Sequence, residues 1–260
     1  MNPQAPAPRR AVILGASNVF RNISTVVATA QCAWGQPLEL LIAAGHGRSY
    51  GAWNWVLGYS VPGILHCGLW HAMETQPHLP TAALITDVGN DLLYGTSAKT
   101  ILRWIETCLE RLHPRCERIV ISELPLASVA RLKPSHYRML RSVLFPWSRV
   151  SFEEVVASAN CLNAGLIELS QKFSAHIVTP QPTWYGFDPI HVRRRDTFAA
   201  WQTLLTPWSD ASTSFSAEGS VWQWWQLRLR RTHVQRFLNR ERLTAQPALR
   251  YADGSTVSLY

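Results

Sequence analysis

Short apolar runs alternate with longer amphipathic segments along this chain, and that alternation restricts the folds open to it. Five of the apolar runs are expected to be β-strands, and they span residues 11–14, 38–44, 82–86, 118–122 and 176–179. Apolar side chains recur at spacings of three and four, as in helices with one face on a sheet, in residues 18–32, 98–112 and 152–173. This order predicts an α/β fold, a three-layer α/β/α sandwich around a roughly five-stranded parallel sheet.

The end of the chain differs in composition from the rest. We therefore expect two units, an α/β domain over residues 1–208 and a C-terminal extension over residues 209–260. Within the extension, residues 221–243 are dense in Trp and Arg and could form a helix that covers the core or meets an anionic surface. Residues 249–260 are expected to form a hairpin, because the Asp-Gly pair at 253–254 is a favoured two-residue turn.

The positive charge of the chain is concentrated in this extension. The formal net charge is +8, and six arginines lie between residues 228 and 242. We therefore expect no nucleic-acid partner, while contact of this segment with an anionic surface stays open. The apolar runs fall far short of the ~20 residues that cross a bilayer, and the run at 11–14 is too short for a secretory signal. These features predict a soluble, cytoplasmic protein.

The cysteines and histidines do not suggest a metal site. The five cysteines are odd in number and never spaced as a CxxC pair, and His66 and His71 are five residues apart, so they do not share a helix face. We expect no metal and no other cofactor.

Polar side chains follow three of the predicted segments, where sites lie in doubly wound sheets. Ser17, in the sequence GASN, follows the first strand, and a strand-to-helix turn would expose its hydroxyl as a nucleophile. Asn90, in DVGND, follows the third strand, where its amide could donate. Asp188 and His191, in FDPIH, lie late in the chain, and a carboxylate three residues before a histidine can orient its ring. Each site also has a structural alternative: Ser17 could be an N-cap, Asn90 could belong to an ordinary turn, and Asp188 could start a helix that carries His191 on the surface.

In this order, the residues resemble the SGNH hydrolases, also called GDSL-type esterases and lipases. The resemblance spans residues 11–205, about three quarters of the chain. It implies a flavodoxin-like fold of the SGNH type. It also implies that Ser17 is the nucleophile, that Asp188 and His191 complete a catalytic triad, and that Asn90 binds the oxyanion.

The resemblance further implies a second oxyanion donor and several substrate contacts. In that family a glycine after the second strand donates its N–H group, and we expect Gly47 rather than Gly45 to do so here, because Arg and Ser follow it. The side of the site that faces the substrate is expected to contain Asn18, Gly45, His46 and Asp91. For His46, an exposed loop histidine is the alternative.

Two positions depart from the pattern of the family. Ala16 stands where Asp usually precedes the serine, and Val88 stands where the third motif begins with Gly. The first change would loosen the turn that holds Ser17. The second places a β-branched side chain where glycine flexibility is usual.

The resemblance predicts a serine esterase or deacetylase that hydrolyses a small carboxylic ester, such as an acetylated sugar or lipid, through an acyl-enzyme. The N–H groups of Ser17 and Gly47 and the amide of Asn90 would stabilise the oxyanion. The same triad would also support acyl transfer to an alcohol if the pocket excludes water. A different alternative is a non-catalytic binding module of the same fold, suggested by Ala16, Val88 and the arginine cluster. An α/β-hydrolase fits less well, because its Gly-x-Ser-x-Gly elbow would end in Gly where this chain has Val19.

Overall fold

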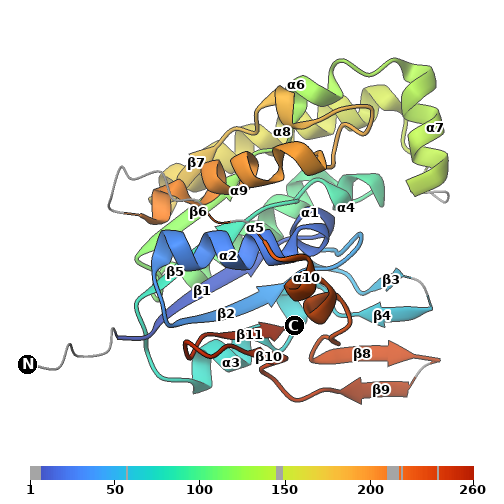
Figure 1. Ribbon diagram of the computed structural model, residues 1–260. Coiled ribbons are helices and arrows are strands. Elements are labelled where there is room, and N and C mark those ends of the chain that lie inside the picture. Colours follow the sequence, from blue (N-terminus) through green and yellow to red (C-terminus); the bar gives the residue numbers. More distant parts are fainter. Residues whose placement is uncertain (1–6, 57, 145–148, 210–216, 218, 239) are drawn as a thin grey trace, which may run out of the picture.

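A seven-stranded, mostly parallel sheet forms the centre of the molecule (Figure 1). The computed structural model describes residues 7–56, 58–144, 149–209, 217, 219–238 and 240–260. The strand order is β10-β11-β2-β1-β5-β6-β7, and only the β10–β11 pair is antiparallel. The bounds are β1 (Arg9–Leu14), β2 (Leu38–Ala43), β5 (Thr81–Ile85), β6 (Arg118–Ser122), β7 (His176–Val178), β10 (Leu249–Arg250) and β11 (Thr256–Leu259).

The five predicted strands are β1, β2, β5, β6 and β7, and the α/β class and parallel sheet are confirmed. Among these five the spatial order is second, first, third, fourth, fifth, which is the flavodoxin-like order. The second strand thus lies on one side of β1 and the third strand on the other, so the order in which strands are added to the sheet reverses at β1 and β5. In doubly wound sheets, a crevice for ligands opens at the carboxyl ends of the strands at this point.

Helices cover both faces of the sheet because successive strand residues point to opposite sides. Val12 and Leu14 of β1 pack in the core with α3, α5 and α8, whereas Ala11 and Ile13 pack in the core with α2 and α9. The central strands β1, β2, β5 and β6 are buried on both faces, as parallel strands usually are. The helices are α1 (Ser17–Arg21), α2 (Ile23–Trp34), α3 (Leu69–Thr75), α4 (Asn90–Leu93), α5 (Ala98–Leu112), α6 (Leu126–Val129), α7 (Pro134–Leu144), α8 (Phe152–Lys172), α9 (Thr197–Leu205) and α10 (Val221–Arg228).

Local capping explains where the long helices begin. The Ser97 side chain accepts the Thr100 N–H at the start of α5, and Ser151 and Glu154 form a reciprocal capping box at the start of α8. The two predicted helices there are confirmed. The helix predicted over residues 18–32 is instead divided at Asn22, which lies outside helical geometry between α1 and α2.

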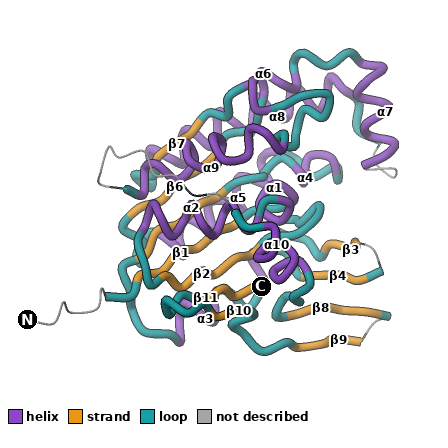
Figure 2. The backbone as a smooth tube through the Cα atoms, viewed as in Figure 1, coloured by secondary structure: helices purple, strands orange, loops and turns teal. Residues whose placement is uncertain are grey.

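The C-terminal extension contains less helix than the sequence suggested. α10 ends at Arg228, and the chain then forms β8 (Val234–Phe237) and β9 (Arg240–Leu243). These strands join β3 (Asn54–Val56) and β4 (Tyr59–Val61) in a second sheet of order β3-β4-β8-β9 (Figure 2). A helix through residue 243 is therefore wrong. The pairing of β8 with β4 is a long-range interaction that a local helical pattern does not contain.

Residues 249–260 form a hairpin, β10 and β11, which also extends the central sheet. The two-residue turn predicted at 253–254 is wrong, because residues 251–255 connect the two strands. Thr256 to Leu259 pair in parallel with residues 39–42 of β2. Strands from both sides of residue 208 thus share both sheets, while residues 210–216 lie outside the described residues, so the division into two units stays a prediction. Among the helices of the described ranges, none has the length and apolar character that a membrane crossing needs.

Candidate active site

Ser17 is the first residue of α1 and lies just beyond the carboxyl end of β1. The turn before it is crowded: a Cβ on Gly15 would lie 2.5 Å from Cγ2 of Val19 and 3.0 Å from Cγ2 of Thr86, so only glycine fits. The residue preceding the helix is Ala16, whose own side chain cannot cap the helix. Ser17 therefore lies inside the first turn of α1, and its hydroxyl does not serve as the N-cap of this helix.

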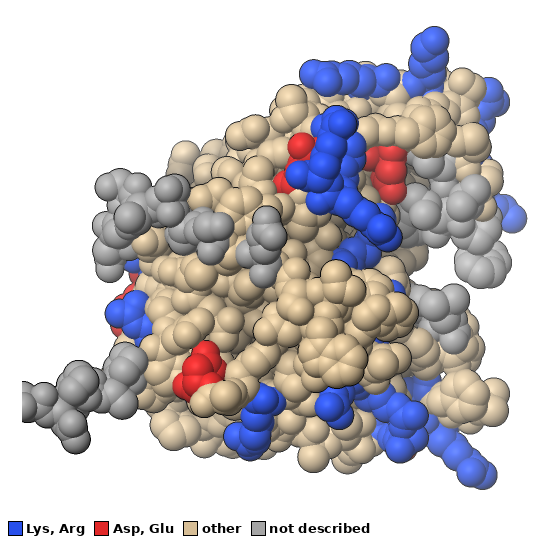
Figure 3. All heavy atoms as spheres, in the orientation of Figure 1, with Lys and Arg blue, Asp and Glu red and all other residues tan. Residues whose placement is uncertain are grey.

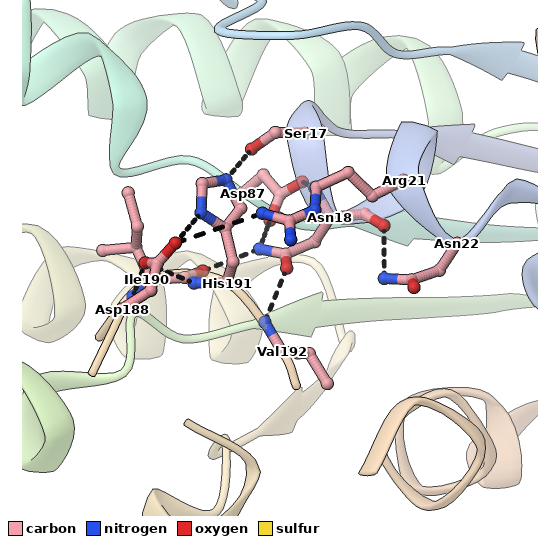
Figure 4. Close-up of polar contacts among 9 residues, drawn as sticks. All are labelled: Ser17, Asn18, Arg21, Asn22, Asp87, Asp188, Ile190, His191 and Val192. Atoms are coloured by element: carbon pink, nitrogen blue, oxygen red, sulfur yellow. Dashed lines mark hydrogen bonds and ion pairs between the residues drawn. The ribbon is translucent and has the colours of Figure 1, made fainter. Parts of the chain in front are cut away.

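The hydroxyl of Ser17 is hydrogen-bonded to the imidazole of His191 (Figure 4). The Oγ–Nε2 distance is 2.8 Å, although the two residues are 174 positions apart in the chain. On the other side of the ring, Nδ1 lies 2.6 Å from Oδ2 of Asp188. The structure thus brings together the three predicted triad residues in the order hydroxyl, imidazole, carboxylate.

Asp188 is held in its charged form. Burial by itself would raise the pKa of this carboxyl, but the hydrogen bond from His191, the charge of His191 and the N–H groups of Ile190 and His191 together bring the pKa below its usual value. Those two N–H groups donate to Oδ1 at 3.2 Å. An ionised Asp188 fixes the ring orientation of His191 and stabilises the imidazolium when Nε2 takes a proton.

Asp87 fixes the backbone around the serine, a role that the sequence analysis missed. Its Oδ2 accepts the N–H groups of Ala16 at 2.9 Å and of Asn18 at 3.0 Å, and its Oδ1 accepts the Asn18 side-chain amide at 2.8 Å. Asp87 follows β5, the neighbour of β1, and has a left-handed backbone with φ of 58°. The sequence contained one signal for this role, an acidic residue at the end of the strand predicted to neighbour the serine.

The contacts of Asp87 explain how the fold accommodates Ala16 and Val88, the two departures from the pattern of the family. The N–H of Ala16 is anchored by Asp87, so the turn is held without an acidic side chain at position 16. The left-handed residue beyond β5 is Asp87, and Val88 is not among the described residues with positive φ. A β-branched side chain at position 88 therefore carries no backbone strain, and it packs in the core.

Asn18 links the serine turn to the histidine loop. Its side-chain amide donates to the carbonyl of Ile190 at 2.8 Å as well as to Asp87, and its Oδ1 accepts the N–H of Val192 at 3.0 Å. The residues on both sides of His191 are thus tied to the residue after Ser17 (Figure 4). Asn18 also lines the pocket, so contact with the substrate stays a prediction, but its hydrogen bonds make it a positioning residue.

We expect the Asn18→Ala variant to lose about 10- to 100-fold in kcat while KM changes little, because the Ser17–His191 distance is no longer fixed. Steady-state kinetics with a p-nitrophenyl ester measure the split between the two constants. Asn22→Ala is the matched control, because the Asn22 amide also donates to a carbonyl, that of Asn18, but has no contact with the histidine loop. A loss of thermal stability in both variants without the selective loss of kcat in Asn18→Ala would contradict this role.

A pocket opens beside Ser17 and contains Asn90. Apolar side chains from α4, α6 and the loop before α6 form much of its wall, among them Leu92, Leu93, Leu124, Leu126 and Val129. Asn90 is only 9% exposed, and its Nδ2 has no hydrogen-bond partner within the described structure. An unpaired buried amide is costly unless a ligand uses it. The pocket therefore offers a donor that suits an oxyanion.

The glycines predicted after β2 lie in a turn over residues 45–48. Gly47 has φ of 58°, and its carbonyl accepts the hydroxyl of Tyr94 at 2.7 Å. A Cβ at this position would lie 2.3 Å from that hydroxyl. Neither Gly45 nor Gly47 is among the residues that line the pocket beside Ser17, so the oxyanion role of Gly47 and the substrate contact of Gly45 stay predictions.

The other two predicted substrate residues lie in different surroundings. Asp91 is 1% exposed, and its Oδ2 accepts the N–H of Tyr50, so the carboxylate holds the loop that follows β2. Burial raises the pKa of Asp91 above its usual value. His46 is half-buried and packs edge-on against Phe20 of α1.

His46 gives a pH-dependent contribution to stability. Burial first, and then the charges of Arg228, His191 and Arg21, lower the pKa of His46 to about 4 from 6.5. Between these values the unfolded chain binds a proton that the folded chain does not, so the free energy of unfolding falls as the pH is lowered through this window.

We expect the His46→Gln variant to show a smaller difference in the free energy of unfolding between about pH 7 and about pH 4.5 than the parent protein does. Denaturant titrations at the two pH values measure this difference. His78→Gln, which changes an exposed histidine, is the control and should leave the difference unchanged. An equal pH dependence in the parent and His46→Gln would contradict the expectation.

No group of three or more His, Cys, Asp and Glu in the described ranges has an arrangement that could hold a metal ion.

Comparison with solved structures supports the fold. A carbohydrate acetylesterase family member from Sinorhizobium meliloti matches 76% of this chain and 96% of its own, with a TM-score of 0.51 and 15% identity. An aryl esterase from M. smegmatis matches 76% of this chain and 96% of its own, with a TM-score of 0.49 and 10% identity. A lipolytic G-D-S-L family member from Veillonella parvula matches 74% of this chain and 94% of its own, with a TM-score of 0.46 and 10% identity. No protein-family model and no curated protein matches the sequence. The resemblance to SGNH hydrolases is thus confirmed for the fold, and at such identities for the fold alone.

Proposed function

We propose that this protein is a serine esterase that hydrolyses a carboxylic ester through an acyl-enzyme on Ser17. The observation that carries the proposal is the line of hydrogen bonds from Ser17 Oγ through His191 to Asp188, at the crevice beside β1 and β5. A hydroxyl that is hydrogen-bonded to a histidine, with a carboxylate on the other ring nitrogen, is the arrangement that activates a nucleophilic serine.

The chemistry needs two proton transfers through one ring. Nε2 of His191 takes the Ser17 proton as Oγ attacks the carbonyl carbon, and the carbonyl π electrons move to the oxygen. The Asn90 amide, with the N–H groups of Ser17 and Gly47, stabilises this oxyanion. The oxyanion collapses, the bond to the alcohol oxygen breaks, and His191 gives its proton to that oxygen. Water then attacks the acyl-enzyme in the same way and releases the acid.

The shape of the pocket supports an apolar acyl group. Its walls are mostly apolar, with leucine and valine side chains the commonest, and they would exclude water from an acyl chain and favour its burial. The Sinorhizobium meliloti neighbour is described as a carbohydrate acetylesterase. For this chain we propose that acyl groups longer than acetyl also fit.

A fluorophosphonate probe tests the proposal directly. We expect the folded protein to be labelled once, with the mass increase on the peptide that contains Ser17, and the heat-unfolded protein to remain unlabelled. A series of p-nitrophenyl esters from acetate to octanoate should show kcat/KM rising beyond acetate. Product analysis with an added alcohol separates hydrolysis from acyl transfer. The proposal fails if the folded protein is neither labelled nor able to cleave any ester of the series.

A further inference from the structure

Two arginines from distant parts of the chain lie beside the catalytic residues. Arg21 is in α1, one turn after Ser17, and residues four apart share a helix face. Arg228 is the last residue of α10 in the C-terminal extension. α10 is fastened to α1 by the indole of Trp224, which donates to the carbonyl of Arg21 at 2.7 Å. The extension thus places a second cation next to the helix that carries the nucleophile.

The guanidinium of Arg228 lies over two aromatic rings. Its central carbon is 4.2 Å from the ring centre of Phe20 and 5.0 Å from that of Trp224. One of its N–H groups points to Nε2 of His46 at 3.3 Å, where a neutral imidazole can accept it. A guanidinium has five N–H donors, and in the described structure one of those of Arg228, on Nη1, contacts His46, so the others are available for an oxyanion. Arg228 is therefore held in place, and it still has N–H groups that could bind a ligand.

Neither arginine is neutralised by a close carboxylate. Within the described parts of the chain, Arg228 forms no ion pair, and Arg21 makes only a long contact of 4.0 Å with Asp188, which already binds His191. Burial first, and then the charge of Arg21, lower the pKa of Arg228, whereas Tyr59 raises it. On the face drawn in Figure 3, patches of Lys and Arg are more extensive than patches of Asp and Glu.

These arginines lie outside the apolar pocket, and Arg21 lies 4.0 Å from the Asp188 carboxylate that binds His191. His191 protonates the alcohol oxygen, so that part of the ester lies next to its imidazole. Arg228 lies 3.3 Å from His46, and Arg21 contacts Asp188, which in turn binds His191, so both arginines lie near the catalytic histidine or its neighbour His46. The apolar pocket for the acyl group contains none of His46, Arg21 and Arg228.

We propose that Arg21 and Arg228 bind an anionic group on the alcohol portion of the ester, so that the preferred substrates carry a carboxylate or phosphate there. This inference rests on the proposed esterase function. It assigns the C-terminal extension a place in substrate selection, because Arg228 can contact the substrate only when α10 is packed on α1. A charge-assisted pair of this kind changes binding by about 10- to 100-fold.

A pair of esters that differ only in charge tests the inference. 4-Acetoxybenzoate carries a carboxylate on the leaving phenol, and methyl 4-acetoxybenzoate is its neutral counterpart. The measured quantity is the ratio of kcat/KM for the two esters, normalised to the parent protein so that leaving-group reactivity cancels. We expect the ratio to fall about 10-fold or more in Arg228→Gln, to fall less in Arg228→Lys, and to fall in Arg21→Gln as well. Added salt should lower the ratio in the parent.

Arg230→Gln is the matched control, because Arg230 is exposed and lies just beyond the end of α10. Its ratio should stay within about twofold of the parent. Since Arg228→Gln could loosen the packing of α10, Arg21→Gln serves as the second variant, with an exposed side chain that does not hold α10. Unchanged ratios in both Arg21→Gln and Arg228→Gln would overturn the inference, even if both esters are cleaved.

A binding measurement separates this inference from the proposed function. In the Ser17→Ala protein, calorimetry compares 4-hydroxybenzoate with the neutral 4-hydroxybenzamide. We expect only the anion to bind, and its binding to be lost when Arg228→Gln is added. If the parent cleaves neither ester, the esterase proposal fails, and this measurement still decides whether the arginines form an anion site. Equal binding of the two compounds overturns the anion site.

Discussion

The Ser17→Ala variant is expected to hydrolyse p-nitrophenyl butanoate with kcat/KM reduced by about 10⁴-fold or more. The hydroxyl is the attacking group, and the remaining residues can neither form an acyl-enzyme nor replace the oxygen that His191 activates. The change removes one hydrogen bond at a site that is 7% exposed, so the free energy of unfolding should fall by no more than about 1 kcal/mol. Kinetics and denaturant unfolding of the same preparation measure both quantities.

Ser24→Ala is the matched control for this prediction. Ser24 is also buried, with 5% exposure, and lies in α2, the next helix along the chain. We expect this variant to retain the rate of the parent within about threefold. A Ser17→Ala protein that cleaves esters as fast as the parent would remove Ser17 as the nucleophile and the proposed function with it.

The Asn90→Ala variant is expected to lose about 100- to 1,000-fold in kcat, corresponding to about 3 kcal/mol of transition-state stabilisation. The amide is buried, lines the pocket with Ser17 and has no partner in the described structure, so it is available to the oxyanion. Because no internal hydrogen bond of Nδ2 is broken, stability should change far less than activity. Parallel measurements of kcat and thermal unfolding test this dissociation.

The Asn90→Asp variant gives a sharper version of the same experiment. The side chain keeps its size, but an ionised carboxylate has no N–H donor and repels a developing negative charge. We therefore expect it to be at least as inactive as Asn90→Ala. If either variant keeps kcat within a few-fold of the parent, Asn90 does not stabilise the oxyanion, and the unpaired amide needs another explanation.

Much of the catalytic arrangement was predictable because it depends on local patterns at strand ends. The apolar runs at 11–14 and 82–86 identified two strands, so Ser17 and Asn90, which follow them, were expected at the carboxyl ends of strands; the structure shows that these two strands are neighbours. Asp188 and His191 are three residues apart, so their contact is nearly local. Asp87 was missed because its function is a hydrogen bond to another strand's turn, which its own surroundings do not reveal.

The C-terminal extension shows the limits of local reasoning most clearly. β8 and β9 lie in a Trp- and Arg-rich segment that suggested a helix, yet β8 pairs with β4 from the first quarter of the chain, and β9 pairs with β8. β strand propensity depends on such neighbours more than helix propensity does. Arg228 likewise has no local signal, since its partners Phe20 and His46 are about 200 and 180 residues away in sequence.

The sequence by itself determined the α/β class, the buried parallel strands and the residue types available for ester chemistry, since each depends on periodicity and on side chains close together in the chain. Tertiary structure alone decided which groups meet: the hydroxyl of Ser17 with Nε2 of His191, the carboxylate of Asp87 with the serine turn, and Arg228 with the helix of the nucleophile. The physical reason is that these contacts join segments whose approach is set by packing of the whole chain around two cores, and no short stretch of residues contains that information.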